Sequence, residues 1–140
     1  MSLHQKLQEA KSEEDVKDAY IKALGLKGYS KNLIDIQTKE IWFEAQDNSK
    51  LSSYQMFTQL MHYVQQALIK GDHVPPFLCV IDTKKAAIMK SADMLPFLAK
   101  NTIKWGKSAS GYTQEALDAI SAYIGTCFVS FKIETVLEPA

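Results

Sequence analysis

The feature that most constrains the fold is a short apolar run, FLCVID, at residues 77–82. Turn-forming segments bound it, with Pro75 and Pro76 before it and TKK after it. A continuous apolar run of this length is typical of a strand that is buried on both faces at the centre of a sheet. The residues that follow, AAIMK, are its expected hairpin partner. The chain must therefore build a sheet with covering layers.

Two amphipathic helices are expected to cover this sheet. Residues 13–24 follow a Ser12 N-cap, carry acids in their first turn and end before Gly25. Residues 53–70 place apolar side chains at helical spacing up to Gly71, which predicts the longest helix. Weaker signals predict a short helix or arm at 3–10, a short helix at 94–100 capped by Ser91 or Asp93, a loop at 101–112, a helix at 113–124 and a strand at 127–134.

Length and composition favour one α/β domain over residues 1–140. With 140 residues, 46% of them hydrophobic, the chain can bury one substantial core. No stretch approaches the roughly 18 apolar residues of a spanning helix, and the charged start is unlike a signal peptide, so we expect no membrane segment and a cytoplasmic protein. Cys79 and Cys127 lie in apolar runs and are expected to be buried thiols. The ending ETVLEPA leaves open that the chain is a fragment of a longer protein.

An acidic pair stands out on the predicted hairpin formed by residues 29–37 and 40–46. Side chains alternate along a strand, so Glu44 and Gln46 point the same way. Asp35 lies within the apolar first strand and is expected to face Glu44, an arrangement with a desolvation cost unless something compensates. Mg²⁺ would compensate, because it binds one or two carboxylates together with water and phosphate oxygens, and it activates a water for attack on a phosphodiester.

These segments resemble the PD-(D/E)XK nuclease superfamily. The resemblance covers residues 13–82 and rests on an early helix acid, LIDIQTKEIWFEAQ, a helix containing YQMFTQLMHYV and the strand FLCVID. It is strongest to the N-terminal nuclease-like domain of restriction-modification enzymes fused to adenine DNA methyltransferases. The resemblance implies a restriction-endonuclease-like fold, a mixed central sheet flanked by helices, with Mg²⁺ as cofactor, DNA as partner and an attached or associated methyltransferase.

By position, the resemblance assigns Asp35 and Glu44 as metal ligands, Gln46 to the place of the catalytic lysine, and Glu13 or Glu14 as the helix acid. Gln46 is the departure from the motif, because a neutral amide stabilises developing negative charge poorly. Lys50 in the following loop, or Lys31 beside the first strand, is expected to supply the missing charge. If neither does, the domain is a cleavage-dead remnant that retains metal or DNA binding.

Two alternatives for the acidic pair remain open. In the first, Asp35 sits at the solvated end of its strand and Glu44 lies on an exposed sheet face, paired with Lys31 or Lys39. In the second, a one-residue slip of the hairpin register places the two acids on opposite faces and removes the site.

The lysines suggest where nucleic acid would bind. All 16 basic residues are lysine and they balance 16 acids, so neither net charge nor an arginine fork predicts a nucleic-acid partner. Between residues 84 and 107, however, six lysines face one acid, which predicts an electropositive face. The predicted contacts to phosphates and bases are Lys84, Lys85, Lys104, Trp105 and Lys107. The alternatives are a solvated loop, or a non-catalytic module that binds DNA or protein.

Overall fold

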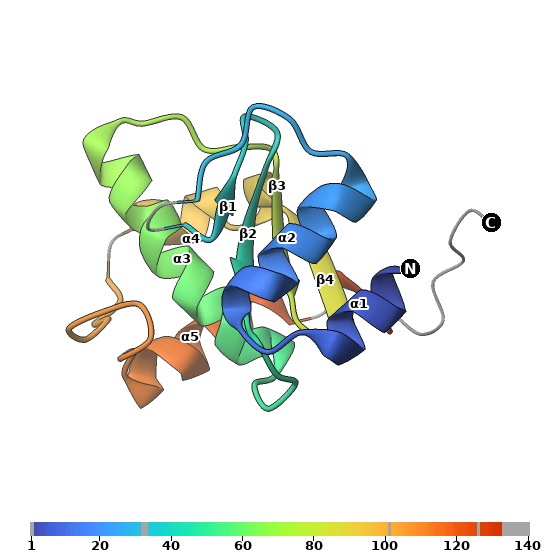
Figure 1. Cartoon of the computed structure of the whole chain (residues 1–140). Coiled ribbons are helices and arrows are strands. Elements are labelled where there is room, and N and C mark those ends of the chain that lie inside the picture. The colour runs from blue at the N-terminus through green and yellow to red at the C-terminus, as the bar shows by residue number, and fades with distance from the viewer. Residues whose placement is uncertain (1, 32–33, 101, 126, 133–140) are drawn as a thin grey trace.

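A five-stranded mixed sheet crosses the middle of the molecule in the computed structural model, which describes residues 2–31, 34–100, 102–125 and 127–132 (Figure 1). The strands are β1 (Ile36–Gln37), β2 (Ile41–Ala45), β3 (Phe77–Ile81), β4 (Lys85–Lys90) and β5 (Val129–Lys132). They lie side by side in chain order, and only the β2–β3 pair is parallel. The predicted mixed central sheet is confirmed.

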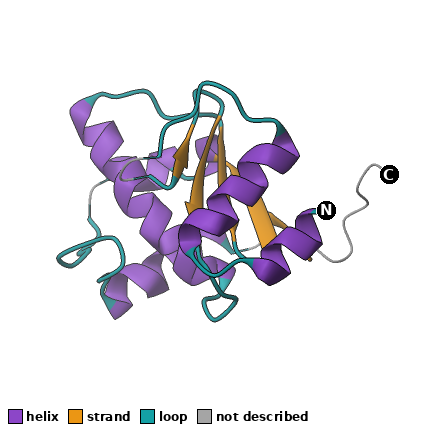
Figure 2. Ribbon diagram, in the orientation of Figure 1, coloured by secondary structure: helices purple, strands orange, loops and turns teal. Residues whose placement is uncertain are grey.

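Helices cover both faces of the sheet (Figure 2). One face carries α1 (Leu3–Glu9) and α2 (Glu13–Leu24), and the other carries α3 (Ser53–Lys70), α4 (Leu95–Ala99) and α5 (Gln114–Ile124). A 3₁₀ turn, Ser91–Asp93, precedes α4. Because side chains alternate along β3, Leu78 and Val80 enter the core under α3 while Cys79 and Ile81 enter the core under α2. The predicted central strand is thus buried on both faces.

Capping residues set the bounds of the main helices. The Ser12 hydroxyl accepts a hydrogen bond from an amide in the first turn of α2, and Gly25 ends that helix in the left-handed region at φ 61°. Ser52 forms a capping box at the start of α3, and Gly71 ends it at φ 75°. Thr113 caps α5. The predicted bounds of α2 and α3 are confirmed.

Among the described residues, the first strand is much shorter than the predicted 29–37, of which residues 32 and 33 lie outside the described part. Backbone pairing of β1 with β2 covers Ile36 and Gln37, with an isolated bridge between Ser30 and Gln37. On β2, the next backbone N–H that points toward β1 is that of Ala45. It donates to the Asp35 carboxylate at 2.8 Å rather than to a backbone carbonyl of β1. A side chain has therefore replaced the next backbone contact of the ladder.

Three further expectations differ from the structure. The N-cap of α4 is Met94, without a side-chain hydrogen bond, so capping by Ser91 or Asp93 is wrong; Pro96 in the first turn favours a start there. Cys79 is buried but Cys127 is exposed. The last strand starts at Val129, and residues 133 and 134 of the predicted strand lie outside the described residues. None of the helices described combines the length and apolar character that a bilayer-spanning segment requires.

Candidate carboxylate site on the first hairpin

The hairpin register brings Asp35 and Glu44 together. Ile36 pairs with Phe43, so the next pair along the ladder sets Asp35 opposite Glu44. Glu44 is 5% exposed and the Asp35 side chain is 15% exposed. The register slip does not occur, and the alternative that puts Glu44 on an exposed sheet face is wrong.

Asp35 is held by three partners on two elements. Its Oδ2 accepts the backbone N–H of Ala45 at 2.8 Å, and its Oδ1 lies 3.3 Å from the ammonium nitrogen of Lys17 on α2. Its carboxylate also shares a hydrogen bond with Glu44. Because Lys17 is itself mostly buried, with 13% of its side chain exposed, this ion pair is screened less than a surface pair.

Glu44 is a carboxyl group that the fold keeps neutral. Burial is the main cause that raises its pKa to about 9, followed by the negative charge of Asp35 and the hydrogen bond to it. Glu13 acts in the same direction, and the Gln46 amide, which donates to Glu44 Oε1 at 3.4 Å, opposes it. At neutral pH the pair therefore holds one proton, and its negative charge faces Lys17.

Of the two helix acids, Glu13 is the one coupled to this pair. Partial burial and then the charge of Asp35 raise the pKa of Glu13, and Lys17 opposes them. Glu14 instead forms ion pairs with Lys31 and, at 3.7 Å, with Lys17. Since Glu13 and Lys17 are four residues apart, they lie on one face of α2, above the hairpin.

Neither lysine expected to replace the motif lysine contacts the pair. Lys31 binds Glu14 and, at 2.9 Å, Asp18. Lys50 is exposed, and among the described residues its ammonium has no contact with Asp35 or Glu44. The ammonium beside the pair is instead that of Lys17 on α2, 3.3 Å from Asp35 Oδ1. In the sequence, Lys17 is marked only by standing four residues after Glu13, on the same helix face. Its contact with Asp35 depends on how α2 packs on the hairpin, which that spacing does not predict.

Tyr63 on α3 is the other neighbour that the sequence did not single out. Burial raises the pKa of its phenol, and the charges of Glu44 and Asp35 add to that effect. The sequence pattern counts Tyr63 as part of the apolar face of α3. Tyr63 comes from α3, which covers the face of the sheet opposite α2, the helix that carries Lys17.

The lysine-rich region does not form one surface. Trp105 is partly buried and packs against the core under α3. It donates its indole N–H to Gln65 and meets the His62 ring edge-on, with 5.5 Å between ring centroids. These contacts hold its indole against the protein. Lys104 and Lys107, on the same loop, are exposed.

Lys84, on the β3–β4 turn, and Lys85, the first residue of β4, lie elsewhere, near α1. Lys84 is exposed, whereas Lys85 is half-buried and paired with Asp82. The predicted electropositive face thus divides into two lysine groups on different sides of the sheet.

The donor set limits what the hairpin can bind. Among the described residues, no group of three or more His, Cys, Asp or Glu side chains is arranged to hold a metal ion. Asp35 and Glu44 supply two carboxylates, which is the number that Mg²⁺ takes from many proteins when waters and substrate phosphates complete its shell.

Compared with protein-family models, with curated proteins and with solved structures, the chain has no significant match. The geometry of the hairpin and the chemistry of its side chains are therefore the basis for a functional conclusion.

Proposed function

We propose that this chain is a nuclease-like domain that acts on DNA phosphodiesters at the Asp35–Glu44 hairpin. One observation carries the proposal: a buried carboxyl group, Glu44, is forced against a second carboxylate at the point where the β1–β2 ladder stops. Burying such a pair destabilises a fold, because each group disfavours ionisation of the other. Carboxyl pairs of this kind cluster at functional sites.

A divalent cation is the ligand that fits this pair. The two carboxylates would bind Mg²⁺ through hard oxygen ligands once Glu44 gives up its proton. Such an ion, when bound, lowers the pKa of a coordinated water and offsets charge on a phosphate. With only two protein carboxylates, the substrate would supply part of the coordination shell.

Lys17 is our assignment for the positive charge that Gln46 lacks. Its ammonium lies 3.3 Å from Asp35 and emerges from α2, so it would reach a phosphate oxygen held at the hairpin. There it would stabilise negative charge that develops in the transition state. Gln46 would hold Glu44 through its amide, 3.4 Å away, and Glu13 would add negative charge beside the ion. The setting implied by the resemblance is a restriction-modification system with an associated methyltransferase.

The second candidate is a non-catalytic module that binds DNA or protein with the same fold. The neutral state of Glu44, whose pKa of about 9 keeps it protonated, favours this candidate, as does the absence of the motif lysine at Gln46. Binding of a divalent ion separates the two, since only the nuclease needs both acids ionised.

The test is a Mn²⁺ titration by calorimetry at pH 8, beside nicking of supercoiled plasmid. We expect the native chain to bind and nick, and Asp35→Asn/Glu44→Gln to do neither. Lys17→Met should keep Mn²⁺ binding and lose about 100-fold in nicking rate. Lys22→Met, an exposed lysine in the last turn of α2, is the matched control.

Each outcome decides between the candidates. Binding without nicking by the native chain would mark a degenerate nuclease that keeps its metal site. A native chain that neither binds the ion nor nicks would overturn the metal site and favour the non-catalytic module. If Lys17→Met nicks at the native rate, the role assigned to Lys17 is wrong, and the roles assigned to the two carboxylates are unaffected.

A further inference from the structure

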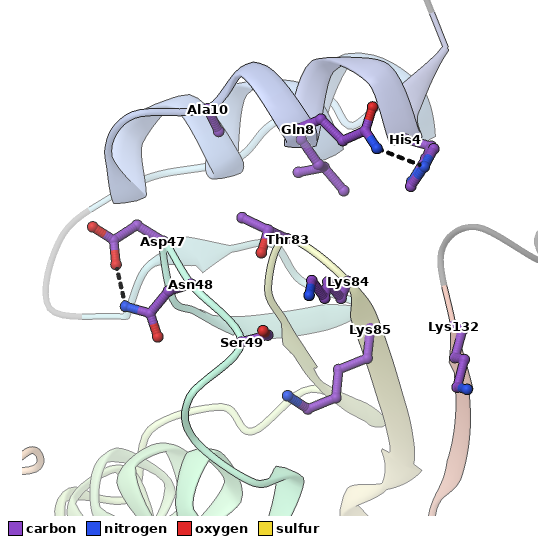
Figure 3. A pocket seen from close by; sticks show the side chains of 11 residues that line it. His4, Gln8, Ala10, Asp47, Asn48, Ser49, Thr83, Lys84, Lys85 and Lys132 are labelled. Atoms are coloured by element: carbon purple, nitrogen blue, oxygen red, sulfur yellow. Dashed lines mark hydrogen bonds between the residues drawn. The ribbon is translucent and has the colours of Figure 1, made fainter.

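The described residues form depressions on both faces of the sheet. One, of about 970 Å³, lies on the α1 side and is shown in Figure 3, where α1 faces the β2–α3 loop and the β3–β4 turn. The Lys85 ammonium beside it is already engaged, because it contacts Asp82 and donates to the Leu51 carbonyl at 2.8 Å. Another, of about 520 Å³, lies between the β1–β2 hairpin and α3 and is lined by residues from 28–42 and 63–73. We call it the α3 pocket.

The floor of the α3 pocket is apolar. Ile34, Trp42 and Ala67 are buried side chains of this lining, and the half-buried ring of Tyr63 extends the same surface. They come from the hairpin on one side and from α3 on the other. Ligand sites of this size combine a mainly apolar surface with a few polar groups that orient the ligand. The floor therefore suits a flat, apolar ring.

The polar side chains of the α3 pocket have no partners within the protein. Among the described residues, no hydrogen bond or ion pair engages the hydroxyls of Ser30 and Tyr63, the Gln37 amide, or the ammonium groups of Lys39 and Lys70. Helix ends and turns elsewhere in the chain use such groups as caps, as Ser52 does at the start of α3. Here they stand around an apolar floor, available to a ligand.

The charge at the rim of the α3 pocket favours an anion. Lys39, in the β1–β2 turn, and Lys70, in the last turn of α3, are both exposed and stand against one exposed acid, Asp72. His73 Nε2 lies 2.9 Å from the Lys39 carbonyl, and this contact ties the α3–β3 loop to the β1–β2 turn. The two lysines thus sit on segments that the fold holds together.

The α3 pocket adjoins the carboxylate pair. Trp42 and Glu44 are two residues apart on β2, so their side chains leave the strand on the same face, where Trp42 packs in the core under α3. Tyr63 lines the pocket, and the charges of Glu44 and Asp35 contribute to the raised pKa of its phenol. Ile34, another lining residue, directly precedes Asp35. A ligand in the pocket therefore lies beside the pair.

We propose that the α3 pocket binds one unpaired nucleotide of the DNA strand that reaches Asp35 and Glu44. Its base packs on the apolar floor beside the Tyr63 ring, and Lys39 and Lys70 bind the phosphates that flank it. A base inside a duplex is stacked and paired, so it cannot enter the pocket without leaving the helix. This inference rests on the proposed function, and it adds a substrate class: single-stranded rather than duplex DNA.

The experiment measures binding of fluorescent oligonucleotides by anisotropy, in EDTA, which keeps divalent ions away from the carboxylate site. The probes are a short single strand of mixed sequence, a strand of the same length with abasic sugars, and the matching duplex. We expect the native chain to bind the single strand about tenfold more tightly than either other probe, because only the single strand offers a free base to the floor.

Side-chain changes locate the binding. Lys39→Gln/Lys70→Gln should weaken single-strand binding about tenfold and lower its salt dependence, because phosphate contacts are lost. Tyr63→Leu should weaken it about fivefold, whereas Tyr63→Phe, which keeps the ring, should bind within about twofold of the native chain. The matched control, Lys84→Gln/Lys107→Gln, removes two exposed lysines outside the pocket and should bind as the native chain does. Circular dichroism confirms that each variant folds.

Three results would overturn the inference. Equal affinity for the single strand and the abasic strand, or for the single strand and the duplex, would show that no base enters the pocket. A loss in Lys84→Gln/Lys107→Gln as large as in Lys39→Gln/Lys70→Gln would place the strand elsewhere. A native chain that binds a free mononucleotide and no oligonucleotide would make the ligand a free nucleotide.

Failure of the nuclease proposal is seen separately. Asp35→Asn/Glu44→Gln should bind the single strand in EDTA at least as tightly as the native chain, since the change removes negative charge beside the pocket. A native chain that binds the single strand as described but never nicks DNA would contradict the nuclease and leave the pocket standing. Nicking that persists while the lysine and Tyr63 variants bind as the native chain does would contradict the pocket and leave the nuclease standing.

Discussion

Two buried acids at the carboxyl ends of neighbouring parallel strands have opposite surroundings. Asp82, which follows β3, is fully buried and accepts the amides of Lys84 and Lys85 as well as the Lys85 ammonium. Glu44, in β2, is almost as buried but meets another acid, Asp35, and one amide at 3.4 Å. Both acids lie at the same end of the strands, yet the Asp82 carboxylate has several hydrogen-bond donors and the Glu44 carboxyl group has only one.

This comparison teaches that burial alone does not mark a functional acid. A buried carboxylate with enough donors serves the fold, because its charge is compensated where it sits. A buried carboxyl group short of donors must stay protonated or acquire a cation. Replacing Asp82 should therefore lower the free energy of unfolding, and replacing Glu44 should raise it.

The largest effect is expected for Asp82→Ala. The change leaves two backbone amides and the Lys85 ammonium without their acceptor, which costs about 3 kcal/mol of the free energy of unfolding. Urea denaturation at pH 7 measures it. Asp118→Ala, at an exposed acid on α5, is the control and should change stability by less than about 0.5 kcal/mol. Equal losses in both variants would refute the special role of Asp82.

Glu44→Gln should have the opposite sign. The folded pKa of about 9 exceeds the ordinary 4.5, so between these values the unfolded chain binds fewer protons and native stability falls as pH rises. The neutral amide removes this dependence. Without divalent ions, native stability should fall by about 2.5 kcal/mol relative to Glu44→Gln between pH 5 and pH 7. Parallel stability curves for the two proteins would show that Glu44 is ionised in the folded state.

The smallest effect is expected for Tyr20, whose hydroxyl links α2 to the turn that follows β3. Its side chain is buried and its hydroxyl bonds the carbonyl of Asp82 at 3.1 Å. Tyr20→Phe leaves that carbonyl without this donor and should lower the free energy of unfolding by about 1 kcal/mol. Tyr29→Phe, at an exposed tyrosine, should have no measurable effect. Thermal unfolding of both variants measures the difference. If Tyr20→Phe is as stable as the native chain, the Tyr20 hydroxyl does not stabilise the Asp82 turn.

Local signals predicted most of the fold. The Ser12 and Ser52 caps and the glycines at 25 and 71 sit at the ends of α2 and α3 as expected, because capping depends on residues adjacent in sequence. The pairing of Asp35 with Glu44 also followed from alternation along a hairpin. The early end of β1 did not, since it depends on a side chain taking the place of a backbone carbonyl.

Long-range packing decided the rest of the site. Lys17 reaches Asp35 from a helix that precedes the hairpin, and no spacing rule links a helix face to a strand position. Trp105 was expected to stack on bases because it stands among lysines, yet its indole N–H bonds Gln65 on α3. The separation of Lys84 from Lys104 likewise follows from which side of the sheet each loop crosses, and composition carries no information about that.

The order of the strands has a consequence for synthesis. Because β1 to β5 lie side by side in chain order, each strand that leaves the ribosome meets a partner that has already been made. The acidic hairpin and the helix that supplies Lys17 belong to the first third of the chain, whereas β5 is made last. We therefore expect the carboxylate pair to form early during translation, before the sheet is complete.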